Sequence, residues 1–512
     1  MLSAIFGKKS DHPLADIKSA QSLLEDLPRN DAFKSLAELA ELIALLSEQA
    51  EFKLDHEFAV LRLFDEAAQP YVRKLVREYF TPFEINKFQE NRLWLALGTW
   101  SRQVADAYFK LFTAYCNGAR GSTAIRAQVP LLTARAVHAM MWQLKYTCSH
   151  YDQVDNSTWN NLVQLYSYAE RLGYLDTPVS LYPGMTGNTT VKCEVGGLMV
   201  WYDSGLNALS PLYIHLTERI VAHYRSNIDI HAEISQHSRL GFDLNRPSEP
   251  SRINMGATTH PAMRFIGIPA MQAKLEELMK VLKKNIVPDG ISLGGNYEAE
   301  VVKNAVQYLL SYVIAPPVRR NIRRMVDVRL NVVDSFDNVV EQTGAGLDFG
   351  KAAEISAQWV TEEISAGGFS AVVPAKGNDS IGIGSLLGIQ PEGLPHWGVA
   401  VVRRLVRDDA DQLRIGAEIL SNQIAGVVLN QNSVPGGAIE NGQPALWLNA
   451  RRNDSTSEGQ LLMRADTFSP GRSLQIVMDG KNYLLMPAGL QEKGLDYDLA
   501  KFRFVVQETG ED

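Results

Sequence analysis

VRRNIRRMVDVRLNVV (residues 318–333) and EEISAGGFSAVV (residues 362–373) are the two stretches that decide the fold of this chain. The first, called the arginine segment below, has five arginines within eleven positions of a chain whose net charge is −8. A guanidinium group can hold a phosphate or a guanine edge through two parallel hydrogen bonds, and it can stack on a purine. The segment therefore predicts an anionic partner, and a guanine nucleotide fits better than a carboxylate. The five residues are Arg319, Arg320, Arg323, Arg324 and Arg329.

The second stretch has the pattern of a tight turn that leads into a strand. Glu363 and Ser365 would project from this turn, and two glycines, Gly367 and Gly368, would let the backbone approach a ligand closely. The Glu363 carboxylate could accept hydrogen bonds from N1–H and N2–H₂ of guanine. The predicted ligand-binding residues are Arg319, Arg320, Arg323, Arg324, Glu363, Ser365 and Gly368.

Together these residues resemble the two signatures of the PilZ family, R-x-x-x-R and, after a strand pair, (D/N)-x-S-x-x-G. Arg320 to Arg324 matches the first signature, and Arg319 to Arg323 repeats its spacing. Glu363 to Gly368 matches the second, with glutamate where the family has Asp or Asn. With the strand-like segments that follow, the resemblance covers about residues 317–421. It implies a β-barrel that binds the bacterial second messenger cyclic di-GMP, with the arginines on its phosphates and guanines.

Other interpretations of the same residues remain open. A run of arginines is also typical of a solvated or salt-bridged face, and E-I-S-A-G-G can be an ordinary turn. The extra methylene of Glu363 moves its carboxylate by about 1.5 Å. The alternative function is therefore a degenerate PilZ protein-interaction scaffold that no longer binds the nucleotide.

A second alternative hypothesis is that the N-terminal half is an enzyme. Its candidate acids, Glu41, Glu48 and Asp65, fall on the polar faces of amphipathic helices, where solvated surface is the usual role of a carboxylate. The sequence therefore predicts a protein that is not an enzyme, with no catalytic residue.

The composition of the chain also limits its possible partners, location and cofactors. An isoelectric point near 5.8 argues against nonspecific binding to nucleic acid or to an anionic membrane. No apolar run approaches the roughly 20 residues that a membrane helix needs, so we expect no membrane insertion and a cytoplasmic location. Three cysteines without C-x-x-C spacing predict neither a disulfide framework nor a zinc site, and we expect no cofactor and no metal.

The predicted fold class is multidomain α+β. We expect an N-terminal all-α helical bundle or solenoid, and a C-terminal PilZ-like β-barrel followed by a second small β-barrel or sheet. In this prediction, the arginine segment is a hinge between domains. Cyclic di-GMP binds there and changes the domain arrangement, and the helical region contacts an unidentified protein effector. The resemblance implies control of motility, pili, attachment or exopolysaccharide. The predicted domains are residues 1–175 (helical), 176–316 (a mixed, mainly helical connection), 317–425 (PilZ-like barrel) and 426–512 (C-terminal β domain).

Overall fold

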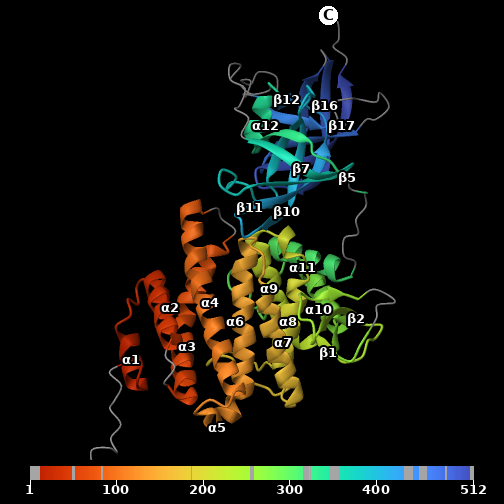
Figure 1. The fold of residues 1–512 in the computed structure, drawn as a ribbon. Coiled ribbons are helices and arrows are strands. Elements are labelled where there is room, and N and C mark those ends of the chain that lie inside the picture. Colours follow the sequence, from red (N-terminus) through yellow and green to blue (C-terminus); the bar gives the residue numbers. More distant parts are fainter. Residues whose placement is uncertain are drawn as a thin grey trace, which may run out of the picture. The chain divides into compact units, whose positions relative to one another are not determined.

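The protein divides into two compact units, Met1–Pro317 and Val318–Asp512, each described by itself below. A computed structural model describes residues 12–48, 52–81, 85–185, 187–253, 259–314, 322, 324–344, 357–431, 442–448, 458–478 and 481–507. The first unit is mainly helical and the second is built from strands (Figure 1).

The helices of the first unit follow one another with short connections. They are α1 (Ile17–Glu25), α2 (Ala32–Glu48), α3 (Leu54–Tyr79), α4 (Lys87–Cys116), α5 (Ser122–Ile125), α6 (Val129–Ser149), α7 (Asn156–Arg171), α8 (Val191–Tyr202), α9 (Pro211–Tyr224), α10 (Pro269–Leu282) and α11 (Ala299–Ile314), with 3₁₀ turns η1 (Arg126–Gln128), η2 (Leu206–Ala208) and η3 (Arg225–Asn227).

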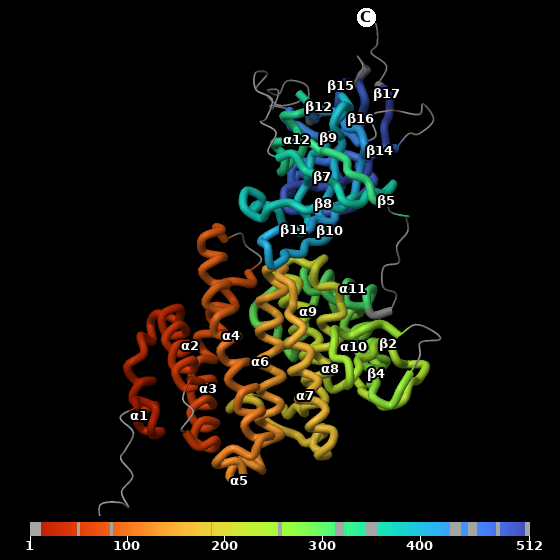
Figure 2. The backbone as a smooth tube through the Cα atoms, in the orientation of Figure 1, coloured from red at the N-terminus to blue at the C-terminus, as the bar shows by residue number. Residues whose placement is uncertain are grey.

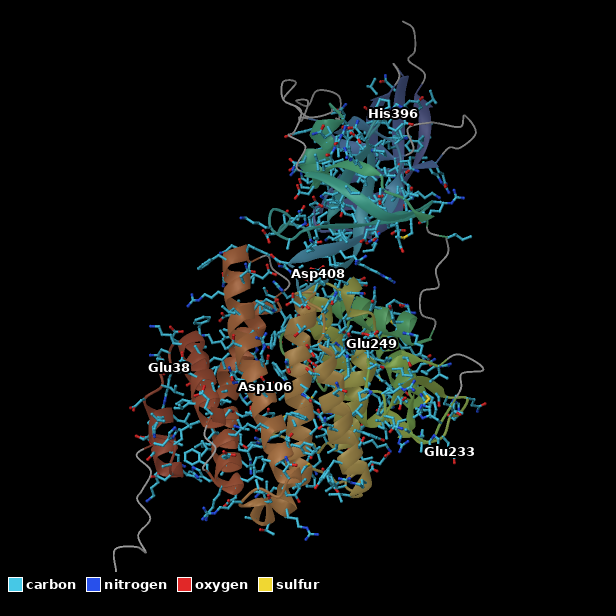
Figure 3. All side chains as sticks on the ribbon, viewed as in Figure 1. Glu38, Asp106, Glu233, Glu249, His396 and Asp408 are labelled. Carbon is cyan, nitrogen blue, oxygen red and sulfur yellow. The ribbon has the colours of Figure 1, made fainter. Side chains whose placement is uncertain are left out.

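Apolar residues at three- and four-residue spacing form the buried faces of these helices. In α2, for example, Leu36, Leu39 and Ile43 are fully buried. Helix starts carry side-chain caps, as at Asn86, whose side chain accepts a hydrogen bond from the backbone N–H of Gln89 at 2.8 Å. Helix α4 packs against α2, α3 and α6 (Figure 2), and side chains fill the spaces between the helices (Figure 3). One continuous apolar core results.

Two features of the first unit differ from the sequence prediction. The Pro-, Gly- and Thr-rich stretch after residue 177 has the sequence pattern of a short hairpin, but the structure has only a single bridge there, Val179 to Thr189, and α8 follows at once with Thr190 as its N-cap. Helix α8 is buried on nearly all sides, so it lacks the amphipathic period by which a helix is usually found. The polar composition of the stretch at 244–261 predicts a connecting loop, but the structure places strand β3 within it, in a small antiparallel sheet of order β1-β4-β2-β3. Its strands are β1 (Asp229–His231), β2 (Ser238–Asp243), β3 (Ser251–Arg252) and β4 (Met263–Gly267).

The second unit begins with a six-stranded antiparallel barrel. The strand order is β7-β6-β9-β10-β11-β8, and the β7–β8 pairing closes the ring, while the short strand β5 pairs with β7. Its strands are β5 (Arg324–Met325), β6 (Arg329–Asp334), β7 (Ala357–Ser365), β8 (Gly368–Pro374), β9 (Leu386–Pro391), β10 (Gly398–Arg407) and β11 (Gln412–Ser421), with helix α12 (Phe336–Gln342) after β6.

A second closed barrel follows, of order β12-β13-β14-β17-β16-β15. Its first strand was not predicted, because IAGVVLNQ directly continues the preceding strand pair with only a two-residue turn. The strands are β12 (Ile424–Gln431), β13 (Gln443–Leu448), β14 (Glu458–Arg464), β15 (Leu474–Met478), β16 (Lys481–Lys493) and β17 (Tyr497–Gln507).

The two barrels pack together through a shared apolar core. This core joins Val399 and Val401 of the first barrel to Leu446 and Leu462 of the second. Arg403 on β10 reinforces it with two hydrogen bonds to the Glu492 carboxylate, 2.7 and 2.6 Å long. The predicted multidomain α+β class, with a helical region followed by two β-barrels, is confirmed. Among the described residues, no helix has both the length and the apolar character needed to cross a membrane.

Candidate functional site

The candidate site of the second unit is centred on the β7–β8 hairpin. Ala366 and Gly367 form its two-residue turn, and Ser365 pairs with Gly368 across it. The Ser365 hydroxyl donates to the Gly368 carbonyl at 3.1 Å, which leaves the hydroxyl oxygen able to accept a hydrogen bond. Glu363 and Ser365 are both half-buried. The tight turn predicted from E-I-S-A-G-G is therefore confirmed.

Strand β5 brings the last residue of the R-x-x-x-R motif beside this hairpin. Arg324 pairs with Ile364, and Met325 pairs with Glu363. Directly opposed residues of an antiparallel pair lie about 5 Å apart and point to the same face. Arg324 therefore lies one strand spacing from the hairpin, on the face of Ile364, whereas Glu363 and Ser365 point to the other face. Its side chain is exposed, and β5 is only two residues long. Arg319, Arg320 and Arg323 lie outside the described residues.

Packing alone requires a glycine at position 368. A Cβ atom added there would lie 2.3 Å from the Ala417 carbonyl oxygen of β11, and carbonyl and backbone have little room to move. This requirement holds whether or not the backbone also contacts a ligand. The outer surface nearby carries an ion pair between Glu362 of β7 and Arg414 of β11.

The interpretation of Asp65 as a solvated surface acid is wrong. Asp65 on α3 is fully buried. It accepts hydrogen bonds from Tyr108 at 2.7 Å and Tyr182 at 3.2 Å, and Arg135 lies 3.5 Å away. Burial raises the pKa of the Asp65 carboxyl, and Arg135 acts in the opposite direction. The polar face of α3 is here an internal face, turned toward α4, α6 and the loop that carries Tyr182. Glu41 and Glu48, by contrast, are exposed.

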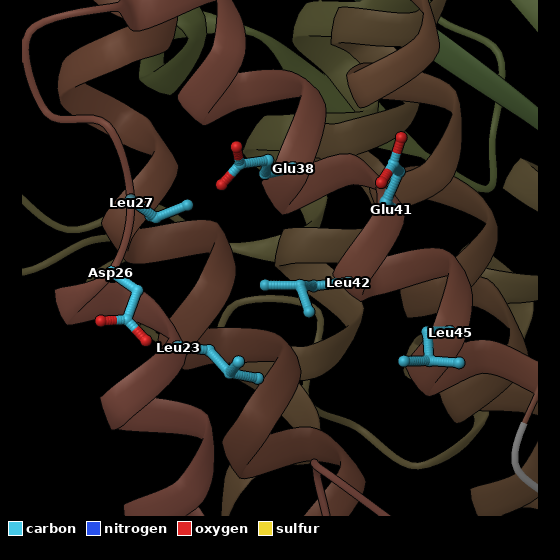
Figure 4. A pocket seen from close by; sticks show the side chains of 7 residues that line it. All are labelled: Leu23, Asp26, Leu27, Glu38, Glu41, Leu42 and Leu45. Atoms are coloured by element: carbon cyan, nitrogen blue, oxygen red, sulfur yellow. The ribbon is translucent and has the colours of Figure 1, made fainter.

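Glu41 belongs to a cavity of about 450 Å³ between α1 and α2 (Figure 4). Its lining combines leucines with three acids, Asp26, Glu38 and Glu41. The negative charges of these three acids would repel a phosphate, so the cavity does not suit a nucleotide.

Among the described residues, no group of three or more His, Cys, Asp or Glu could hold a metal ion. His138 and His150 pair with different acids, Glu194 and Asp152.

The fold defines a class of protein: a helical unit followed by tandem six-stranded barrels, with a candidate ligand-binding hairpin in the first barrel. Residues 18–234 match the family model described as "Cyclic-di-GMP receptor FimW, N-terminal domain". The matched range runs from α1 through β1 and lies wholly in the helical unit. No curated protein and no solved structure matches the chain.

Proposed function

We propose that this protein is a receptor for cyclic di-GMP that acts by binding and not by catalysis. The family model matched by the helical unit is named for cyclic di-GMP receptors, which supports the ligand. The observation that supports the binding site is the β5–β7 pairing, since it holds Arg324, the last arginine of the R-x-x-x-R motif, beside the Glu363-to-Gly368 hairpin. In this proposal the first barrel is of the PilZ kind.

The chemistry assigns each side chain a role. Arg319, Arg320, Arg323 and Arg324 bind the phosphates and stack on or bond to the guanines. Glu363 accepts from the guanine N1–H and N2–H₂ groups. The Ser365 hydroxyl, which already donates to Gly368, accepts from the guanine amino group or from an arginine. Arg324 reaches the ligand around the end of its two-residue edge strand.

The position of the arginine segment suggests how binding would be transmitted. The segment begins at the division between the two units and follows Pro316-Pro317, after helix α11. A ligand that gathers the arginines would fix the path of the chain between α11 and the first barrel. Ordering of a junction by a small ligand is a known way to change domain arrangement. The effector protein would then bind the helical unit, in the cytoplasm.

Calorimetric titration of the full chain with cyclic di-GMP tests the proposal. The Arg320→Ala/Arg324→Ala variant should bind at least about a hundredfold more weakly, because two charge-assisted contacts are lost. A control, Arg464→Ala/Arg503→Ala, removes the same charge from exposed sites of the second barrel and should bind like the unaltered chain. Equal binding by both variants would exclude the site. No binding by the unaltered chain would favour the scaffold alternative.

A further inference from the structure

The helical unit contains a cavity of about 700 Å³ that the barrel site does not explain. Its walls come from α3, α6, α9, loop residues 181–185 and 187–189, and the loop at residues 290–294. This volume lies within the range of small-molecule sites, about 300–1,000 Å³. The two loops carry glycines with positive φ, Gly184, Gly187 and Gly294, so backbone lines the cavity at several points.

The lining is cationic. It includes four arginines, Arg73 and Arg77 on α3, Arg219 on α9 and Arg225 just after it, and no aspartate or glutamate is among the lining residues that the structure describes. Arg225 pairs with Glu194 at 2.8 Å, and Arg219 lies 3.8 Å from Glu218, which also pairs with the buried Lys145. Neither Arg73 nor Arg77 forms an ion pair within the described part of the chain. The cavity therefore has an excess of about two positive charges, which attracts an anion.

The guanidinium groups are held in place before any ligand arrives. The Nε–H groups donate to backbone carbonyls: Arg77 to Gly294 at 3.1 Å, Arg219 to Ser292 at 2.9 Å and Arg73 to Gln69 at 3.2 Å. These bonds occupy one edge of each group, so the terminal nitrogens of Arg73 and Arg77 remain available. Donors fixed in this way lose little freedom on binding, and the fork suits a phosphate.

Several other lining residues are fixed by hydrogen bonds and an ion pair that centre on the buried Glu194. Glu194 accepts from Thr189 at 2.7 Å, pairs with Arg225 at 2.8 Å and bonds to His138 Nδ1 at 3.1 Å. The Trp142 indole N–H donates to His138 Nε2 at 3.0 Å, so the ring proton of His138 lies on Nδ1 and points to Glu194. This chain of bonds sets the orientation of Trp142, whose half-buried ring lines the cavity with Tyr182.

We propose that this cavity binds a nucleotide, with its phosphates on Arg73, Arg77 and Arg219 and its base against the aromatic rings. Bidentate arginines favour phosphate over carboxylate, and the rings favour a ligand with a flat base over inorganic phosphate. The enclosed volume suits a single small nucleotide and not a nucleic acid strand. This inference stands apart from the barrel site, because all lining residues belong to the first unit.

The test titrates the full chain with GTP, ATP, cyclic di-GMP and pyrophosphate as separate probes. At least one nucleotide should bind, and Arg73→Ala/Arg77→Ala should weaken it about a hundredfold. The control Lys34→Ala/Lys74→Ala removes the same charge from exposed helix positions outside the cavity and should leave affinity unchanged. Both arginines are exposed, so the fold should tolerate their loss, and unchanged circular dichroism would establish this.

Three outcomes overturn the inference: no nucleotide binds at millimolar concentration, the arginine variant binds as tightly as the control, or pyrophosphate binds as tightly as every nucleotide. The Arg320→Ala/Arg324→Ala variant separates the two sites. Cyclic di-GMP binding that this variant keeps and the cavity variant loses would support the cavity and refute the barrel site. The reverse result, with no other nucleotide bound at the cavity, would refute the cavity and support the barrel site.

Discussion

Breaking the buried ion pair between Lys145 and Glu218 should strongly destabilise the helical unit. Lys145 Nζ lies 2.7 Å from Glu218 Oε2, and the two side chains are 1% and 5% exposed. Burial raises the pKa of Glu218, but Lys145 and Arg219 lower it more, so it falls from 4.5 to about 2. Burial lowers the pKa of Lys145 to about 8, so the two partners shift in opposite senses, and the direction for Glu218 shows that its charge depends on the nearby cations. Lys145→Met should cost about 3–5 kcal/mol, because it removes the nearest cation from a buried carboxylate and leaves only the more distant Arg219, 3.8 Å away.

Urea unfolding at neutral pH measures this cost, followed by the helical circular dichroism signal, since nearly all described helices belong to the first unit. The double variant Lys145→Met/Glu218→Leu should recover most of the loss, because both charges leave the interior together. The reasoning is refuted if Lys145→Met costs less than about 1 kcal/mol, or if the double variant is as unstable as the single one.

Three further predictions concern the pH dependence of stability, the packing of the first barrel and the reactivity of the cysteines. Because the folded pKa of Glu218 is below its unfolded value, stability should fall as the pH drops from about 4.5 to 2, and Glu218→Gln should flatten this part of the pH profile. Gly368→Ala should destabilise the first barrel by about 1–3 kcal/mol through the clash with Ala417, and an unchanged melting temperature would contradict this. Burial raises the pKa of Cys148 to about 12, so in the folded chain a thiol reagent should modify exposed Cys116 well before Cys148; equal rates would contradict that order.

Local signals in the sequence predicted much of the second unit. The apolar run from Val399 to Val402 and the turn at Ala366-Gly367 depend on residues close in the chain, so the strand and the hairpin could be predicted directly. The helices of the first unit were predictable for the same reason. Gly173, for example, follows α7 with a φ of 71°, a position at which glycine commonly ends a helix.

Features that depend on distant residues could not be predicted. Gln69, four residues away, also donates to Asp65, but the partners from other elements, Tyr108, Arg135 and Tyr182, are 43, 70 and 117 residues away in the chain. The polar side of α3 therefore gave no sign that other elements cover it. The cationic cavity was missed because α3 and α9 supply its arginines separately, and neither helix has the dense cluster that marked the arginine segment.

The site residues remain a prediction, and they rest on one local observation. Strand β5 was not predicted, yet it holds Arg324 opposite Ile364. The spacing of the motif could be determined from the sequence. The face of the sheet to which each side chain points could not, because that face depends on the register of strand pairing. The register shift in the β7–β8 pairing between Thr361 and Glu363 is an example, because it changes which residues face outward beyond it.

Hydrogen–deuterium exchange of the full chain with and without cyclic di-GMP tests the receptor proposal most directly. The proposal predicts that the ligand slows exchange in peptides covering residues 318–325 and 361–370, and that Arg320→Ala/Arg324→Ala abolishes this protection. Unchanged exchange in both peptides at saturating ligand would contradict it, as would protection confined to the peptides that line the cationic cavity.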